Sequence, residues 1–81
     1  MYRILLTKTA EKDLETIDQR YRKPIENRFK ELAVNPLLGK KLKNSLREFR
    51  SLREGVYRII YKIENTELTI YIVAIDHRQS V

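Results

Sequence analysis

Cysteine is absent from this 81-residue chain. Its absence excludes disulfides, zinc–thiolate sites and cysteine nucleophiles. No apolar run approaches the roughly 20 residues that a helix needs to cross a bilayer. The N-terminal sequence Met-Tyr-Arg-Ile-Leu-Leu-Thr becomes charged too early for a secretory signal peptide. We therefore expect one cytoplasmic domain over residues 1–81, with no membrane partner.

Histidine occurs once, as His77. Histidine is the side chain best suited to proton transfer near neutral pH, so one copy excludes a mechanism that uses two histidines as acid and base. With only two glycines, the chain also has no glycine-rich phosphate loop. It shows no paired-histidine or paired-aspartate spacing typical of metal sites. We expect neither a metal nor a cofactor.

The positive charge is concentrated in residues 40–62. This segment has eight basic residues against Glu48 and Glu54, which equals the net charge of +6 of the whole chain. The basic residues are Lys40, Lys41, Lys43, Arg47, Arg50, Arg53, Arg58 and Lys62. A single cationic surface carried by predicted strands indicates a phosphate-rich partner.

The first half of the chain predicts a strand over residues 2–7 and then two helices. Thr9 is expected to cap the first helix, and the second is expected to begin near Pro24 and end at Asn35-Pro36. Apolar residues recur at helical spacing in both segments: Ala10, Leu14, Ile17 and Tyr21 in the first, and Ile25, Phe29, Leu32 and Ala33 in the second. The segment between the two helices is short, which predicts that they form an antiparallel helical hairpin.

The second half predicts three consecutive strands, over residues 47–53, 56–64 and 67–76, joined by turns at 54–55 and 65–66. The last of these strands is apolar on both faces and should lie inside the sheet. Tyr57 and Tyr61 fall at positions that indicate packing. The predicted fold class is α+β, in the order β-α-α-β-β-β. It is an antiparallel sheet, a meander plus the N-terminal strand, with the helical hairpin packed on one face.

Four arginines lie on these strands or at their ends: Arg50, Arg53, Arg58 and Arg78. Neighbouring strands are roughly 4.8 Å apart, so their arginines can converge on one anion. A guanidinium group donates in a planar fork that fits two phosphate oxygens. The alternative is a set of separate surface ion pairs, such as Arg53 with Glu54. The shared location of the arginines favours an anion site.

Two further features lie beside the arginines. Lys40, Lys41 and Lys43 follow the second helix, and we interpret them as a phosphate-contacting rim rather than as a merely solvated loop. Asp76-His77-Arg78 ends the last strand, and His77 there is a candidate for proton transfer. If the protein cleaves RNA, either His77 works with an unusual partner or catalysis is mainly electrostatic.

The pattern resembles the RelE toxins of the RelE/ParE superfamily, from type II toxin–antitoxin pairs. The shared features are Thr-x-x-Ala-x-x-Asp-Leu at 7–14, Asn-Pro at 35–36, Gly-Lys-Lys-Leu-Lys at 39–43, Phe-Arg-Ser-Leu-Arg-x-Gly-x-Tyr-Arg-Ile-Ile-Tyr at 49–61 and His-Arg-x-x-Val at 77–81. The long central motif is the most specific of these, and the matches span nearly the whole chain.

The resemblance implies a metal-independent endoribonuclease that cleaves mRNA in the ribosomal A site and so inhibits translation. Its catalytic residues would be Arg58, Arg78, His77 and Arg53. Arg58 would stabilise charge on the pentavalent phosphate, and Arg78 would do the same near the leaving oxygen. Contacts to rRNA or mRNA would come from Lys40, Lys41, Lys43, Arg47 and Arg50.

One feature departs from the family pattern. Many relatives place a tyrosine directly after the valine that matches Val81, and this chain stops at Val81. That tyrosine is implicated in base stacking and catalysis. We therefore expect weakened catalysis with binding largely retained.

Two alternatives stay open. A ParE-like toxin shares the fold but poisons DNA gyrase, and a non-catalytic module would bind RNA or the ribosome without cleaving it. The resemblance further implies a cognate RelB-like antitoxin that forms a hetero-oligomer with the toxin. An acidic or amphipathic antitoxin segment would suit residues 40–62 electrostatically.

Overall fold

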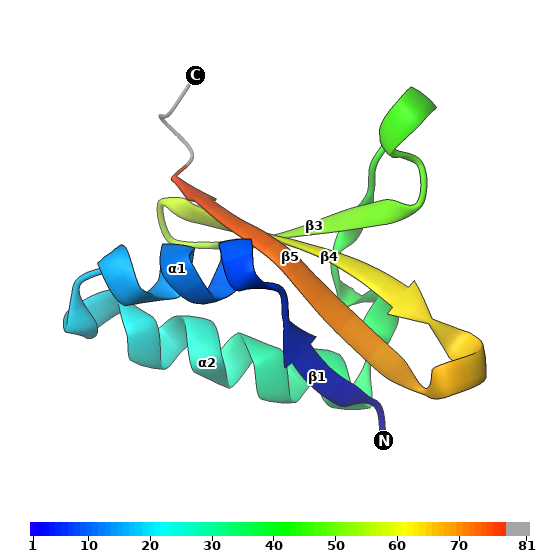
Figure 1. Cartoon of the computed structure of the whole chain (residues 1–81), viewed down its shortest axis with the longest axis horizontal. Coiled ribbons are helices and arrows are strands. Elements are labelled where there is room, and N and C mark those ends of the chain that lie inside the picture. The colour runs from blue at the N-terminus through cyan, green and yellow to red at the C-terminus, as the bar shows by residue number, and fades with distance from the viewer. Residues whose placement is uncertain (78–81) are drawn as a thin grey trace.

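The computed structural model describes residues 1–77, in which two helices lie on one side of a twisted sheet (Figure 1). The helices are α1 (Lys8–Thr16) and α2 (Gln19–Val34). The strands are β1 (Arg3–Leu6), β2 (Lys40–Lys41), β3 (Phe49–Glu54), β4 (Tyr57–Glu64) and β5 (Thr69–His77). Short 3₁₀ turns lie at Pro36–Leu38, Asn44–Leu46 and Asn65–Glu67. This confirms the predicted α+β fold with a helical pair on one face.

The sheet is mixed, with strand order β1-β5-β4-β3-β2. The meander β3-β4-β5 is antiparallel as predicted, but β1 pairs in parallel with β5, which corrects the expectation of an antiparallel sheet. The helical pair connects β1 to the far edge of the sheet. The meander then runs back across the sheet, so that its last strand, β5, lies beside β1. β5 is an interior strand, which agrees with its apolar residues on both faces.

The helix starts differ from the predicted ones. Thr7, not Thr9, caps α1, because its hydroxyl accepts the backbone N–H of Ala10 at 3.2 Å. α2 begins at Gln19 behind the cap Asp18, well before Pro24. The Asp18 carboxylate accepts the N–H of Arg20 and starts the helix early, and Pro24 then lies inside it. No helix within residues 1–77 is both long and apolar enough to cross a bilayer.

The core lies between the helices and one face of the sheet. The predicted apolar face of α2 is confirmed, since all four of its residues are buried: Ile25, Phe29, Leu32 and Ala33. Opposite them lie buried sheet residues: Leu52, Ile59, Tyr61, Ile70, Ile72 and Ile75. Because side chains alternate along a strand, the residues between these project from the other face, which neither α1 nor α2 covers (Figure 1). We call this second face the open face.

Candidate nucleic-acid interface

Arg53 and Arg58 face each other on the open face. They are directly opposite in the β3–β4 register, and both are exposed. Directly paired residues have Cβ atoms about 4.5–5.5 Å apart, where like charges destabilise the sheet. Within residues 1–77 neither guanidinium group forms an ion pair. An anion between them would relieve the repulsion.

Lys40 completes a cationic hollow on this face. It pairs with Ser51 on β3 and therefore projects to the same side as Arg53. A cavity of about 420 Å³ lies among these strands. Its lining consists of Leu38, Gly39, Lys40, Leu42, Ser51, Leu52, Arg53 and Arg58, with no acidic residue among them. We call the cavity with its three cations, Lys40, Arg53 and Arg58, the cationic hollow. Its size and charge suit a phosphate group.

The neighbouring cation on β4, Lys62, is in a different electrostatic state. Its ammonium group lies 3.2 Å from a carboxylate oxygen of Glu64 and 3.7 Å from one of Glu48. The hydrogen bond and the charge of Glu64, followed by the charge of Glu48, raise the pKa of Lys62. The charge of Lys62 is thus compensated within the fold.

Asp76 is opposite Arg58 on β5, yet the two form no ion pair within the described residues.

Arg50 does not join the hollow. It pairs with Tyr61 in the β3–β4 register, on the helix side of the sheet. Its Nη1 donates to the backbone carbonyl of Gly39 at 2.7 Å. The structure therefore separates Arg50 from Arg53 and Arg58. It reaches the lysine segment through the backbone of Gly39.

His77 also lies on the helix side. It is opposite Tyr57 in the β4–β5 register, and the two rings meet edge to face with centroids 5.3 Å apart. Tyr57 in turn lies 6.0 Å from the ring of Tyr21 on α2. Arg58, the next residue on β4, projects from the opposite face. Arg78, the other predicted C-terminal site residue, lies outside the described residues.

The remaining predicted contacts lie along the segment between α2 and β3. Lys41 is in β2, and Lys43 and Arg47 flank the 3₁₀ turn Asn44–Leu46. All three are exposed, and none lines the cationic hollow. They form a basic margin beside it. Within residues 1–77 no cluster of three or more metal-ligating side chains occurs.

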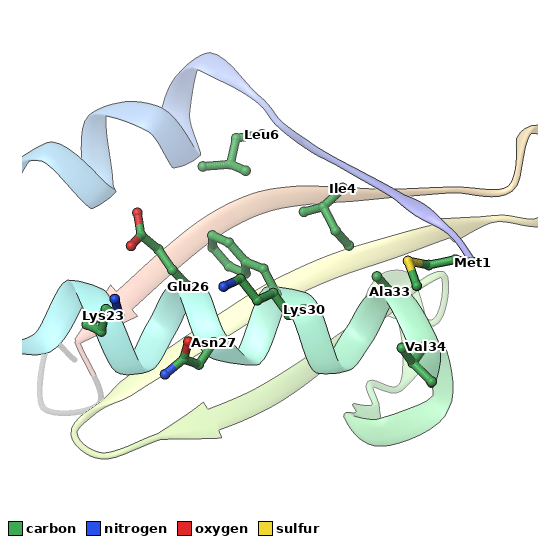
Figure 2. A pocket seen from close by; sticks show the side chains of 10 residues that line it. Met1, Ile4, Leu6, Lys23, Glu26, Asn27, Lys30, Ala33 and Val34 are labelled. Atoms are coloured by element: carbon green, nitrogen blue, oxygen red, sulfur yellow. The ribbon is translucent and has the colours of Figure 1, made fainter.

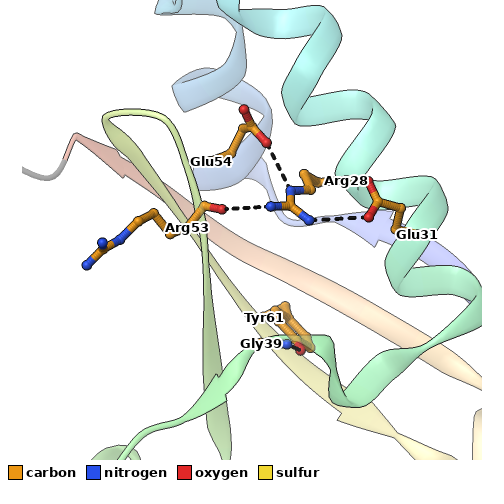
Figure 3. A network of polar contacts seen from close by, with 6 residues as sticks. All are labelled: Arg28, Glu31, Gly39, Arg53, Glu54 and Tyr61. Atoms are coloured by element: carbon orange, nitrogen blue, oxygen red, sulfur yellow. Dashed lines mark hydrogen bonds and ion pairs between the residues drawn. The ribbon is translucent and has the colours of Figure 1, made fainter.

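Sequence reasoning missed Arg28, which ties α2 to the hairpin that carries the paired arginines (Figure 3). Its Nε donates to Glu54 at 2.9 Å and its Nη1 to Glu31 at 3.2 Å, while Nη2 reaches the carbonyl of Arg53 at 3.5 Å. The Arg53 side chain points away from α2 in this view. No sequence signal links Arg28 to Glu54, because the pair depends on how α2 packs on the sheet.

A second concavity, an apolar groove of about 680 Å³, lies between β1 and α2 on the helix side (Figure 2). Ile4 and Leu6 of β1 face Phe29 and Ala33 of α2 across it, and Lys23 and Lys30 are at its rim. Apart from these rim residues and Glu26 and Asn27, its lining is apolar, so this groove is chemically unlike the cationic hollow.

Comparisons with known proteins agree with one another. The family described as "ParE toxin of type II toxin-antitoxin system, parDE" matches residues 4–81. Toxin RelG of Mycobacterium tuberculosis is 34% identical over 99% of this chain and 94% of its own length. Toxin RelE of the same organism is 33% identical over 98% of this chain and 84% of its own length.

Solved structures give the same result. The toxin–antitoxin complex RelBE2 from Mycobacterium tuberculosis contains a chain that superposes with a TM-score of 0.89 at 33% identity, covering 95% of this chain and 98% of that one. The isolated E. coli RelE toxin superposes with a TM-score of 0.87 at 13% identity, covering 100% of this chain and 88% of that one. At that identity the second match shows the fold alone.

Proposed function

The chain belongs to the RelE/ParE family of toxins from type II toxin–antitoxin systems, and we propose that it acts by cleaving mRNA in the A site of the ribosome. The observation that carries this proposal is that Arg53 and Arg58, opposite each other beside Lys40, form no ion pair within residues 1–77. A protein gains nothing in stability from aligning like charges. A phosphoryl-transfer site needs such an array, because negative charge builds on the phosphate in the transition state.

The proposed chemistry is an attack of the ribose 2′-hydroxyl on the adjacent phosphate. The bond from the 2′-oxygen to phosphorus forms, the bond from phosphorus to the 5′-oxygen breaks, and a 2′,3′-cyclic phosphate and a 5′-hydroxyl result. Arg58 stabilises the pentavalent phosphate, together with Arg53 on the adjacent strand β3 and Lys40 on β2 beyond it. The family resemblance implies that Arg78 acts near the leaving oxygen, and we adopt that role in the proposal.

Proton transfer has a smaller part in this proposal. His77 packs against Tyr57 on the side of the sheet opposite Arg58. That position supports a mechanism in which the protein mainly orients the RNA and stabilises charge. Lys41, Lys43 and Arg47 then contact the backbone of mRNA or rRNA around the hollow.

A cognate antitoxin is the proposed protein partner. The related Mycobacterium tuberculosis structure is a toxin–antitoxin complex. The excess positive charge of this chain lies in residues 40–62, so an acidic or amphipathic antitoxin segment over that surface would both bind and block it. The product would be an inactive hetero-oligomer.

The experiment mixes purified protein with ribosomes carrying a defined mRNA and maps the cuts by primer extension, beside free mRNA. We expect cuts within the A-site codon on ribosomes and none on free mRNA. Fragments should end in a 2′,3′-cyclic phosphate. Absence of cleavage in both arms would overturn the proposal.

A second candidate function is poisoning of DNA gyrase, because the matching family is named for ParE. The paired arginines favour the nuclease, since poisoning gyrase requires no phosphoryl-transfer site in the toxin. A supercoiling assay with purified gyrase separates the two. Inhibition of supercoiling without ribosomal cleavage would establish the ParE-type activity.

A further inference from the structure

The segment that carries Lys40 is held to the sheet by the short β2–β3 pairing, by the N–H of Leu42 donating to the carbonyl of Phe49 at 3.0 Å, and by contacts of Gly39. β2 contains only two residues, so few ladder hydrogen bonds fix it. Gly39, directly before it, has both of its backbone polar groups bonded to side chains. Its N–H donates to the hydroxyl of Tyr61 at 2.8 Å, and its carbonyl accepts from Arg50 at 2.7 Å. We call these two contacts the Gly39 clamp.

Tyr61 can hold the segment in place because its hydroxyl both accepts and donates a hydrogen bond. It accepts from Gly39, beside which it lies (Figure 3), and it donates to the carbonyl of Pro36 at 2.6 Å. It therefore joins both ends of the 3₁₀ turn Pro36–Leu38. Tyr61 lies in the centre of the sheet and is fully buried. That burial raises the pKa of its hydroxyl, which keeps the group protonated and able to donate.

The fit around Gly39 leaves no room for adjustment. A Cβ at this position would lie 2.7 Å from both Cε1 and Oη of Tyr61 and 3.0 Å from the carbonyl oxygen of Ser51. The φ of Gly39 is −81°, an ordinary extended value. Glycine is therefore required for close approach and not for backbone conformation.

We propose that Tyr61 and Arg50 are positioning residues for Lys40. The clamp fixes the backbone one residue before Lys40, and this sets where its ammonium group stands in the cationic hollow. Arg50 thus acts on RNA through Gly39 and makes no phosphate contact of its own. The consequence for catalysis rests on the proposed function, but the clamp can be measured without it.

The first test measures amide hydrogen exchange in the free protein by NMR. Tyr61→Phe removes one oxygen and keeps the ring, and the Gly39 amide should then exchange about tenfold faster, as expected for the loss of one net hydrogen bond. Tyr2→Phe is the matched control, since its hydroxyl bonds Asn65 away from the clamp. Unchanged exchange at Gly39 in Tyr61→Phe would overturn the clamp.

The second test is a double-mutant cycle on a non-cleavable single-stranded RNA. Lys40→Gln should reduce the slope of log affinity against log salt by about 0.7, the value for one phosphate contact. In the Tyr61→Phe background the same change should have much less effect, because Lys40 is already displaced. Equal effects in both backgrounds would contradict the positioning role.

Two further variants test whether a general loss of stability, or a direct phosphate contact by Arg50, could explain the result of the cycle. Ile25→Val removes a buried methyl group from α2, and it should lower stability without altering the effect of Lys40→Gln. Arg50→Met should reduce that effect as Tyr61→Phe does. If Arg50→Met instead lowers the slope on its own and leaves the Lys40 effect intact, then Arg50 contacts phosphate directly and the inference is wrong. If neither the wild-type protein nor any variant bound RNA, that result would count against the proposed function. Amide hydrogen exchange at Gly39 would still show whether the clamp exists.

Discussion

Cations on this chain differ by what surrounds them. Arg28 and Lys62 each lie between two carboxylates, so their charges are balanced within the fold. Arg53 and Arg58 are opposite each other and, within residues 1–77, have no acidic partner in contact. An exposed salt bridge contributes only about 0–1 kcal/mol, so compensation alone does not separate these groups by stability. The difference lies in anion binding: Arg53 and Arg58 can still bind an external anion, whereas Arg28 and Lys62 already contact carboxylates.

His77 is predicted to matter less than the arginines. Because it packs on the helix side against Tyr57, His77→Gln should lower the single-turnover cleavage rate by less than about tenfold, below the 10²–10⁴-fold typical of a general acid or base. The rate should be measured from pH 6 to 8 on programmed ribosomes. A loss above a hundredfold, with a flattened pH profile, would show that His77 transfers a proton.

The two glycines should respond in opposite ways to substitution by asparagine. Gly55 has φ +60° and open space where a Cβ would stand, so Gly55→Asn should be better tolerated than Gly55→Ala, because asparagine accepts the left-handed conformation. Gly39 lacks space, so Gly39→Asn should cost more than Gly39→Ala, which itself should cost about 1–3 kcal/mol. Urea unfolding measures all four. If asparagine and alanine ranked in the same order of stability at both positions, then the two glycines would not be required for different reasons, close approach at Gly39 and backbone conformation at Gly55.

At the scale of elements, periodicity predicted most of the fold. The apolar residues of α2 and the alternation of β4 determine which faces are buried, and burial is the largest stabilising term. Helix starts were predicted less well, because the caps Thr7 and Asp18 compete with equally plausible neighbours. The parallel pairing of β1 depends on contacts distant in sequence, which no local pattern encodes.

The candidate site was predicted in part. Arg53 and Arg58 were expected on neighbouring strands with Lys40 beside them, but the predicted turn at 54–55 would place Arg53 opposite Val56. The turn instead lies at 55–56, one residue later, and this sets Arg53 opposite Arg58. Arg50 lies three positions before Arg53, an odd separation that places the two on opposite faces of the strand. Strict counting along the strand would have separated them. The Gly39 clamp needed the structure, because it joins residues 22 positions apart.

The link between α2 and the β3–β4 hairpin yields a stability prediction. Arg28→Ala should lower the free energy of unfolding by about 1–2 kcal/mol, because it removes the part-buried contact to Glu54 that links α2 to the hairpin. Arg20→Ala is the control, since its pair with Asp18 is solvent-exposed and should contribute little to stability. Urea denaturation measures both. Equal losses would show that the hairpin is held by other contacts.

At the scale of the whole molecule, the net charge of +6 lies on one part of the surface, so RNA affinity should depend on where charge is removed. Replacing Lys40, Lys41 and Lys43 by Gln should reduce the salt slope of RNA binding by about 2, at about 0.7 per contact. The same change at Lys12, Lys23 and Lys30, which lie on the helices, should leave the slope unchanged. Equal reductions would indicate binding by net charge alone.

The central claim is that the paired arginines stabilise a transition state. The most direct measurement compares the single-turnover cleavage rate and the RNA affinity of Arg58→Ala with those of Lys62→Ala, a compensated cation on the same face. Arg58→Ala should lower the rate about 10²–10³-fold with little change in affinity. Lys62→Ala should leave both nearly unchanged. A loss of affinity at an unchanged rate in Arg58→Ala would contradict the claim and show that the open face only binds RNA.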